Sequence, residues 1–220
     1  MFPAYLKPIS LHFRKRRNRR LAAMIETLAA ASTEPVSILD VGGSIIFWLS
    51  IPEAVRAKCR ISLLNLPGEY ETWPEGELKL KAQFELVVGD ARELSRYPDR
   101  SFDLVVCNSV LEHVGNWAEI EVAAHELMRI GRSGWVQVPA FEFPVEQHFL
   151  LPFIHWFAAP IQMSILRTLH GGFRRRSYSE QQMSVHHVRP ISRGELRHLL
   201  PSARLSSEWL LFPKSHLATW

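Results

Sequence analysis

Short apolar runs alternate with helical periodicities along the chain, and this alternation predicts an α/β sheet protein. The apolar runs that predict five successive strands are residues 36–41, 61–66, 84–88, 101–108 and 135–139. The first of these is unbroken enough to be a parallel strand buried on both faces. Alternating residues at 204–212 and 215–220 predict two more strands at the end of the chain.

Helical patterns fill the intervals between these strands. Residues 11–31 place Leu21, Met24, Ile25 and Leu28 on one apolar face. A short helix at 45–49 is expected to restart at 53–58, after Pro52, and residues 116–130 predict a longer helix ended by the glycines at 131 and 134. Residues 67–83 are expected to be a loop, and Ser192 with Glu195 forms a capping box for a helix at 194–200.

The first predicted strand ends in an unusual sequence, Asp40-Val41-Gly42-Gly43-Ser44. Two glycines after a buried strand predict a tight turn, because glycine adopts backbone angles closed to other residues and lets a ligand approach the main chain. Ligands of open α/β sheets bind at the carboxyl ends of strands where the strand order reverses. This turn is therefore the first candidate for a cofactor site.

Three stretches together resemble the class I S-adenosylmethionine-dependent methyltransferases, in their small-molecule "type 11" branch. They are residues 38–43 (Ile-Leu-Asp-Val-Gly-Gly), residues 88–91 (Val-Gly-Asp-Ala) and residues 102–114, which include Asn108-Ser109-Val110-Leu111-Glu112-His113. The resemblance covers about residues 36–140. It implies a Rossmann-like fold whose seven-stranded, mostly parallel sheet ends in a C-terminal antiparallel hairpin.

The resemblance also implies which residues hold the cofactor, S-adenosylmethionine. These are Asp40, Gly42, Gly43, Ser44, Asn65, Leu66, Asp90, Ala91, Asn108 and Ser109. The sequence departs from the family at Ser44 and Ile46, which replace the second and third glycines of the turn, and at Asn65, which replaces the acid for the ribose hydroxyls. For two of these residues a local structural role is the alternative to cofactor binding. Asn65 is also typical of a turn before Pro67, and Asp90 of the cap of a helix starting near Arg92.

Histidines after strand ends are the candidates for a general base, which an acceptor hydroxyl would need. His148 with Glu146 is the preferred pair, because both follow the fifth strand, where acceptors dock. His113 is a further candidate, with a positioning role as the alternative. The adjacent His186 and His187 have no partner at metal-ligand spacing, so no metal site is expected.

Composition indicates a single globular domain of 220 residues, 47% hydrophobic, with a net charge of +4. Its expected parts are a basic N-terminal helix (1–31), a cofactor-binding core (32–140), a lid or substrate region (141–191) and a final helix and hairpin (192–220). There are two cysteines, and Cys107 falls in a predicted buried strand, which favours a reducing, cytoplasmic location. No secretory signal is recognisable.

Charged and apolar residues are distributed unevenly along the chain. Six cations lie between Arg14 and Arg20; they predict either a solvated face or contact with an anionic surface such as lipid headgroups or RNA. The lack of interleaved aromatic residues disfavours nucleic acid. The apolar segment 149–161 is broken by prolines and a histidine, so a lid over the strand ends is favoured over a membrane span, with shallow, peripheral insertion into a membrane surface as the competing interpretation.

The functional hypothesis is methyl transfer to the oxygen or nitrogen of a small-molecule or lipid- or glycan-like acceptor. The alternative is a catalytically degenerate methyltransferase-like binding protein, for which Ile46 and Asn65 are the reasons. A nucleotide-sugar or NAD-dependent enzyme is disfavoured, because Gly-x-Gly-x-x-Gly does not follow the first strand. The sequence does not indicate the oligomeric state.

Overall fold

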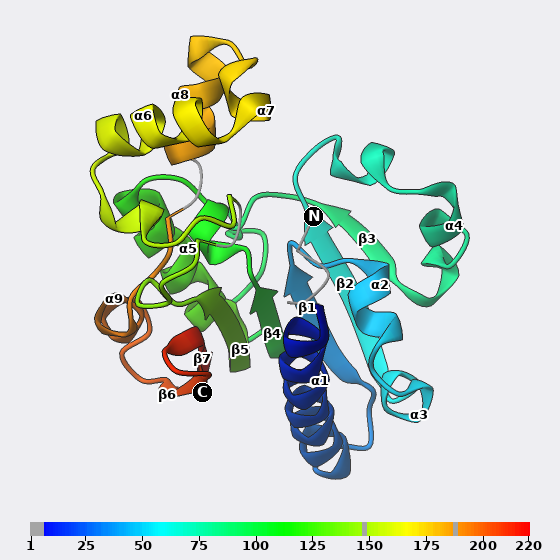
Figure 1. Cartoon of the computed structure of the whole chain (residues 1–220). Helices are drawn as coiled ribbons and strands as arrows, with labels where there is room; N and C mark the ends of the chain where they lie inside the picture. The colour runs from blue at the N-terminus through cyan, green and yellow to red at the C-terminus, as the bar shows by residue number, and fades with distance from the viewer. Residues whose placement is uncertain (1–6, 147–148, 187–188) are drawn as a thin grey trace.

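The structure, a computed structural model, describes residues 7–146, 149–186 and 189–220. Its centre is a seven-stranded sheet in the order β3-β2-β1-β4-β5-β7-β6 (Figure 1). The strands are β1 (Val36–Val41), β2 (Cys59–Asn65), β3 (Glu85–Val88), β4 (Phe102–Asn108), β5 (Gly131–Pro139), β6 (Arg204–Trp209) and β7 (Pro213–Thr219). The pairs among β1 to β5 are parallel, and β7 is antiparallel to both β5 and β6. The predicted sheet and its final antiparallel hairpin are confirmed.

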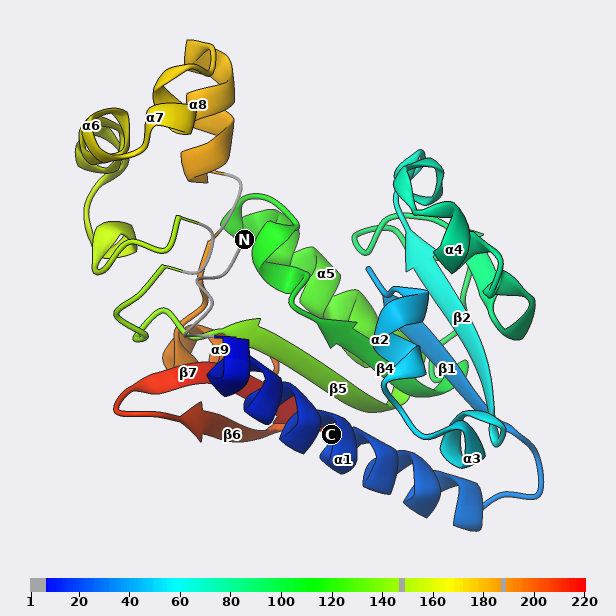
Figure 2. The same ribbon diagram turned by 45° about the vertical axis from the view of Figure 1, so that its right-hand side comes forward.

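Helices cover both faces of this sheet (Figure 2). The helices that precede β4 are α1 (Lys7–Ala30), α2 (Ile45–Leu49), α3 (Glu53–Arg56), η2 (Glu69–Thr72), α4 (Glu75–Leu78) and η3 (Lys81–Gln83). Those that follow β4 are η4 (Leu111–His113), α5 (Trp117–Ile130), η5 (Ile154–Trp156), α6 (Ala159–Leu169), α7 (Gly171–Arg174), α8 (Tyr178–His186) and α9 (Arg193–Leu199).

Two apolar clusters, one on each face, follow from the alternation of strand side chains. On β1, Ile38 packs into the cluster formed with α1, α2 and α3, whereas Leu39 and Val41 pack into the cluster formed with α5 and α9. By the same alternation, Trp135 packs on the α1 face of the sheet and Val136 packs on the α5 face. A polar residue on a strand is therefore assigned to one face by its position alone.

The chain reverses direction across the sheet between β1 and β4. From β1 the strand order runs through β2 to β3 toward one edge of the sheet, and from β4 it runs to β5 toward the other edge. The connections that follow β1 and β4 therefore lead in opposite directions across the sheet. Crevices of open α/β sheets form at such a reversal, at the carboxyl ends of the strands. Figure 1 shows β1, β2 and β4 pointing the same way, with the N-terminal end of α1 near their carboxyl ends.

Several local predictions are wrong. Residues 67–83 hold three short helices, because a loop of this length satisfies its backbone within itself by such turns. The helix ends at Ile130 with Gly131 as its C-cap, as expected, but β5 begins at Gly131 rather than at Trp135, because pairing with β4 already starts there. No helix begins near Arg92, since the segment after β3 forms turns instead.

Residues 149–186 build a small helical lobe beside α5, which is yellow and orange at the upper left of Figure 1. Its own core contains Ile154, Met163, Leu166, Phe173 and Val185. The polar residues Tyr178–His186 form helix α8 of this lobe. In the described ranges, none of the helices combines the length and the apolarity that a membrane crossing requires.

Candidate functional site at the carboxyl ends of β1 and β4

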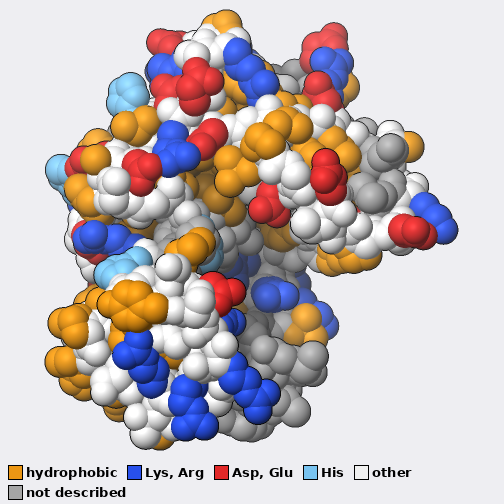
Figure 3. Space-filling model, turned by 90° about the horizontal axis from the view of Figure 1, so that it is seen from above, with side chains coloured by type: hydrophobic (Ala, Val, Ile, Leu, Met, Phe, Trp, Pro, Cys, Tyr) orange, Lys and Arg blue, Asp and Glu red, His pale blue; other side chains and the backbone are white. Residues whose placement is uncertain are grey.

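A large cavity opens beside the first strand turn, between α1 on one side and α2 with α3 on the other. Its volume is about 1070 Å³. Six residues expected to bind the cofactor line it, namely Asp40, Gly42, Gly43, Ser44, Asn108 and Ser109. Figure 3, which views the molecule from above the strand ends, shows a hollow near the middle of this face with Lys or Arg side chains inside it.

The turn after β1 is shaped by its two glycines. Gly42 has φ of 69°, a left-handed conformation, and a Cβ there would stand 2.9 Å from Val110 Cγ1. A Cβ on Gly43 would stand 2.8 Å from the Cβ of Asp40 and nearer still to its carboxylate. Both positions therefore exclude a side chain, and the main chain of the turn is left open to the cavity.

Asp40 is buried at the floor of this cavity, with 1% of its surface exposed. Trp48 Nε1 donates to its Oδ2 at 2.8 Å, while Oδ1 has no hydrogen-bond partner among the described residues. Burial raises the pKa of Asp40 to about 7, and the bond from Trp48 opposes this rise. A buried carboxylate oxygen without a partner beside a cavity is suited to attract a cationic group, whose charge would lower that pKa again.

The N-terminus of α2 faces the same turn. Ser44 is its N-cap, and its Oγ accepts from Phe47 N at 3.3 Å. Ile46 N donates to Glu77 Oε1 at 3.2 Å, so α4 also caps this helix. The Ile46 side chain lies at the cavity wall with 61% of its surface exposed; it therefore lies largely in solvent rather than in the turn.

Asn65 stands at the end of β2 and contacts the glycine turn. Its Nδ2 donates to the carbonyl oxygen of Gly43 at 2.9 Å and lies 3.4 Å from Tyr70 Oη. The amide thus ties the end of β2 to the turn after β1, a task that a carboxylate could not perform because it has no donor. Leu66, the next residue, is exposed.

Asp90 and Ala91 follow β3. Arg92 holds the Asp90 carboxylate, with Arg92 Nη2 2.6 Å from Oδ2 and Arg92 N 2.9 Å from Oδ1. These bonds lower the pKa of Asp90 against the opposing effect of its partial burial. Asp90 is therefore an ionised acceptor at the strand end, while Ala91 is buried beneath it.

The ends of β4 and β5 are joined to α1 by a buried polar network. Arg17 Nη1 donates to Gln137 Oε1 and lies 3.4 Å from Asn108 Oδ1. Ser109 Oγ donates to the same Gln137 oxygen at 2.9 Å, and Ser109 has φ of 60°, a left-handed conformation that is uncommon for serine. The network fixes the loop after β4 relative to α1.

Arg17 also reaches the last strands. Its Nε lies 3.4 Å from Glu208 Oε1, and the two residues are 8% and 6% exposed. Burial lowers the pKa of Arg17, and Glu208 opposes the shift. The neighbouring Lys214 is 9% exposed, and its pKa is lowered first by burial and then by the charge of Arg17.

Two of the candidate general bases, Glu146 and His113, lie away from this cavity. His148 lies outside the described residues, and neither Glu146 nor His113 is among the described residues that line the cavity. Glu146 is buried and accepts from Phe149 N at 2.6 Å; it lines a second cavity of about 990 Å³ between α5 and the helical lobe. His113 Nε2 lies 4.0 Å from Glu112 Oε1.

Arg17, Gln137 and Lys214 also line the cavity, although the sequence did not predict them as site residues. The signal for Gln137 was a single polar residue inside an otherwise apolar strand, and Arg17 was hidden within the basic run. Lys214 had no distinguishing signal. In the part of the chain that the structure describes, no group of three or more His, Cys, Asp or Glu residues is placed to hold a metal ion.

The strand order and the glycine turn at its reversal define an α/β protein with a cavity at the carboxyl ends of β1 and β4, where open α/β sheets bind ligands. Residues 63–136 match a family model described as a methyltransferase domain. Among curated proteins, none matches the sequence. The match covers about a third of the chain, and the strand order is that of the class I methyltransferase fold.

Solved structures share this fold at low sequence identity. Magnesium protoporphyrin IX methyltransferase from Synechocystis, with bound SAH, is 13% identical, with a TM-score of 0.57 over 100% of this chain and 87% of that one. A SAM-dependent methyltransferase from Archaeoglobus fulgidus is 12% identical, with a TM-score of 0.52 over 92% and 93%. An O-methyltransferase family protein from Burkholderia thailandensis is 11% identical, with a TM-score of 0.52 over 94% and 57%.

Proposed function

We propose that this protein transfers a methyl group from S-adenosylmethionine to a small-molecule acceptor. The observation that carries the proposal is the buried, unpaired carboxylate oxygen of Asp40, which lies beside two obligatory glycines at a cavity at the strand reversal. A cofactor with cationic groups and a nucleoside fits such a place. The family match and the fold agree with this assignment.

The methionine end of the cofactor is assigned to the Asp40 cavity. Asp40 would attract the ammonium group, because that charge compensates a carboxylate that burial otherwise disfavours. Gly42, Gly43 and Ser44 would bring main-chain groups to the same end, and Asn108 with Ser109 would form the opposite wall. These residues fit the cofactor in kind, since they offer one anion and an open backbone.

The nucleoside end is assigned to the ends of β2 and β3. Asp90 would accept from the adenine amino group, and Leu66 with Ala91 would contact the ring. Asn65 would offer its amide oxygen to the ribose, since its Nδ2 is used on Gly43. A neutral amide binds a diol less strongly than a carboxylate does, so we expect this chain to hold the cofactor mainly by its methionine end.

The cofactor, when bound, supplies a sulfonium that makes its methyl group electrophilic. The protein then contributes mainly proximity and orientation. Arg17 and Gln137 hold the loop that carries Asn108 and Ser109, so this wall is fixed before the acceptor arrives. Burial of Asp40 and Trp48 keeps water away from the floor of the site.

The acceptor atom is proposed to be oxygen or nitrogen, in a small-molecule or lipid- or glycan-like compound. Residues 141–191 are proposed as the acceptor-side lid, because the helical lobe closes the second cavity, in which Glu146 lies. Glu146, His113 and His148 remain the candidates for deprotonating a hydroxyl. Peripheral membrane contact is the competing role for the lobe, where Phe153, Trp156, Phe157 and Ile161 are exposed.

Calorimetry with S-adenosylmethionine and S-adenosylhomocysteine tests the cofactor assignment. We expect micromolar binding of both, with weaker binding for Asp90→Ala and for Asp40→Ala. Arg132→Gln is the matched control, because Arg132 pairs with Asp103 and not with a residue assigned to the cofactor. If neither compound binds at millimolar concentration, the assignment fails.

Transfer of labelled methyl groups to a panel of hydroxyl- and amine-bearing acceptors tests catalysis separately. Label should reach at least one acceptor class. Tight cofactor binding without transfer to any acceptor would instead support the degenerate binding protein.

A further inference from the structure

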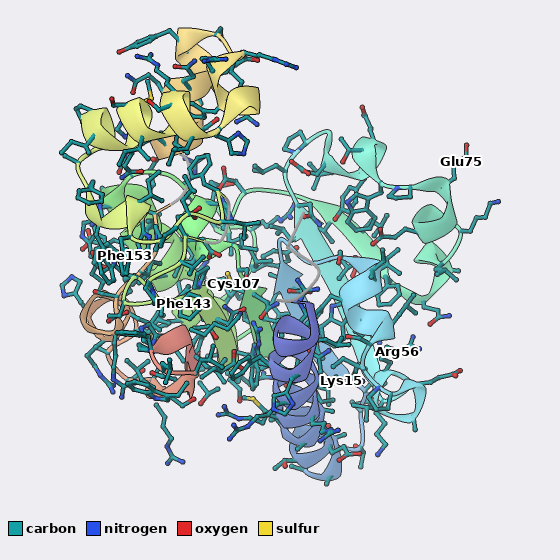
Figure 4. The ribbon with its side chains drawn as sticks, in the orientation of Figure 1. Lys15, Arg56, Glu75, Cys107, Phe143 and Phe153 are labelled. Carbon is teal, nitrogen blue, oxygen red and sulfur yellow. The ribbon has the colours of Figure 1, made fainter. Side chains whose placement is uncertain are left out.

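The cavity beside Asp40 is lined by far more positive than negative side chains. Five cations and two carboxylates are among its lining residues, the carboxylates being Asp40 and Glu26. Four of the cations come from one stretch of α1 and the fifth from β7: Arg14, Lys15, Arg17, Arg19 and Lys214. Figure 4 labels Lys15, which lies on α1 on the side toward α2.

Folding divides the basic run between different tasks. Arg17 is buried against Glu208 and Gln137, and Arg20 Nη2 donates to Ser206 Oγ at 3.1 Å while its guanidinium lies 5.9 Å from the Trp135 ring centroid. These two arginines hold α1 on the sheet. Arg14 and Lys15 line the cavity as Arg17 does, but they are exposed.

Three of the cations repel one another. The charge of Arg14 lowers the pKa of both Arg17 and Lys214, and Arg17 lowers that of Lys214, in each case in addition to burial. Lys214 Nζ lies 5.8 Å from the Phe13 ring centroid, so this cation reaches α1 from the last strand. Two elements far apart in the sequence thus bring like charges together, and Glu208 opposes the pKa shifts of Arg17 and Lys214 with a single carboxylate.

The cofactor does not account for this charge. S-adenosylmethionine carries a sulfonium, an ammonium and one carboxylate, so its net charge is positive. A cationic wall would repel it overall, whereas Asp40 at the floor attracts it. Its single carboxylate could pair with one of the five cations, so a further anion in the cavity would balance the others.

We propose that the wall formed by Arg14, Lys15, Arg17 and Lys214 binds an acceptor that carries a phosphate or carboxylate group. Guanidinium groups match such groups with paired hydrogen bonds, and lysine adds a point charge. This inference rests on the proposed methyl transfer and assigns its acceptor to an anionic class.

The apolar residues of the cavity lining indicate the chemistry of the rest of the acceptor. Leu11, Ala22, Ile46, Phe47 and Val55 give the cavity an apolar side along α1, α2 and α3. Ligand sites commonly measure about 300–1000 Å³, so a cavity of about 1070 Å³ has room for one end of the cofactor and an acceptor together. The acceptor that fits has an apolar body and an anionic group.

Inorganic pyrophosphate, added to protein saturated with S-adenosylhomocysteine, is the probe for this wall. We expect calorimetry to detect binding that weakens with ionic strength and falls at least tenfold in Arg14→Gln/Lys15→Gln. Both residues are exposed, so this variant should fold, and its affinity for S-adenosylhomocysteine should stay within twofold of the unaltered protein. Arg16→Gln/Lys79→Gln is the matched control, because it removes two exposed charges outside the described cavity lining.

The outcomes separate this inference from the proposed function. Bound S-adenosylhomocysteine without any pyrophosphate binding overturns the anionic acceptor and leaves the methyltransferase assignment standing. Equal loss in the variant and the control shows general charge attraction and also overturns it. If Arg14→Gln/Lys15→Gln also loses affinity for S-adenosylhomocysteine, these cations bind the cofactor, and the inference of an anionic acceptor is overturned.

A vesicle experiment distinguishes the two sources of the anionic group. Sedimentation with phosphatidylcholine vesicles containing phosphatidylglycerol, lost in Arg14→Gln/Lys15→Gln but not in the control, identifies a lipid headgroup. Pyrophosphate binding without vesicle sedimentation identifies a water-soluble phosphate or carboxylate. Either result supports the cationic wall as an acceptor site, and absence of both overturns it.

Discussion

The carboxylate of Asp40 occupies the space in which a side chain on Gly43 would stand. A Cβ on Gly43 would lie 2.8 Å from the Cβ of Asp40 and still closer to its carboxylate. The carboxylate cannot swing away freely, since Trp48 Nε1 holds its Oδ2 at 2.8 Å and the residue is buried. The glycine and the acid are thus one structural unit.

Gly43→Ala should therefore destabilise the protein by about 1–3 kcal/mol, the usual cost of overpacking. It should also weaken cofactor binding, because the displaced carboxylate leaves its place at the cavity floor. Urea unfolding and calorimetry measure the two effects. Gly76→Ala is the control, because a Cβ there meets no atom within 4 Å. If Gly43→Ala is as stable as Gly76→Ala, the prediction is contradicted.

The stability of the protein should fall as pH rises through the titration of Asp40. Its pKa is raised from an ordinary value of 3.8 to about 7 in the folded protein, so the folded state keeps a proton that the unfolded state releases. The contribution of Asp40 to stability is then greatest below pH ~4, declines between ~4 and ~7, and levels off above, by a few kcal/mol in total. Asp40→Asn should remove this decline.

Thermal unfolding of both proteins between acidic and slightly alkaline pH measures the effect as a difference. Subtracting the Asp40→Asn curve removes the contributions of histidines and other carboxyl groups. We expect Asp40→Asn to be the more stable protein at pH ~8, because it buries no charge there. A difference that does not change with pH would show that Asp40 titrates normally.

Cofactor affinity should change with pH in the opposite sense. A bound cation favours ionised Asp40, so binding must release a proton wherever the free protein holds one. Below pH ~7 the affinity for S-adenosylmethionine should rise by up to about tenfold per pH unit and reach a plateau above it. Calorimetry in buffers of different ionisation enthalpy counts the released proton, and Asp40→Asn should release none.

Breaking the buried pair of Arg17 and Glu208 should be costly. Removal of one partner leaves the other charge uncompensated, and such losses amount to about 3–5 kcal/mol. Arg17→Met should show this loss in urea unfolding, because Glu208 is 6% exposed and then lacks its cation. Arg16→Met is the control on the exposed side of the same helix.

The double variant Arg17→Met/Glu208→Gln should be less destabilised than the sum of the two single variants, since neither charge is then left alone. Additive losses would mean that the 3.4 Å approach of Arg17 Nε to Glu208 contributes no coupling. The same variants should loosen the wall of the site, because Arg17 also bonds Gln137.

Much of the fold could be predicted from the sequence because its signals are local. The apolar run at Val36–Val41 coincides with β1, and the break at Pro52 separates α2 from α3 as expected. The Ser192 capping box is present, with Ser192 Oγ accepting from Glu195 N at 3.2 Å. The sharp turn at Gly42 followed from the conformational freedom of glycine. Each of these features depends on residues only a few positions apart.

The departures at Ile46 and Asn65 could not be interpreted in that way. Ile46 follows the turn and begins α2 outward, so its side chain is largely exposed. Asn65 replaces an acid, yet its amide bonds the carbonyl of Gly43, 22 positions away. Sequence alone shows the altered residue types, whereas their consequence depends on where the neighbouring strand end lies.

Backbone preference and apolar periodicity act over short spans, so they identify the strands, the glycine turn and the longer helices. The contact of Arg17 with Gln137, 120 positions away, and the position of Lys214 at the same cavity are visible only in the folded protein. Burial and the grouping of charges depend on which surfaces pack together, and residues so far apart carry no local pattern that indicates their contact.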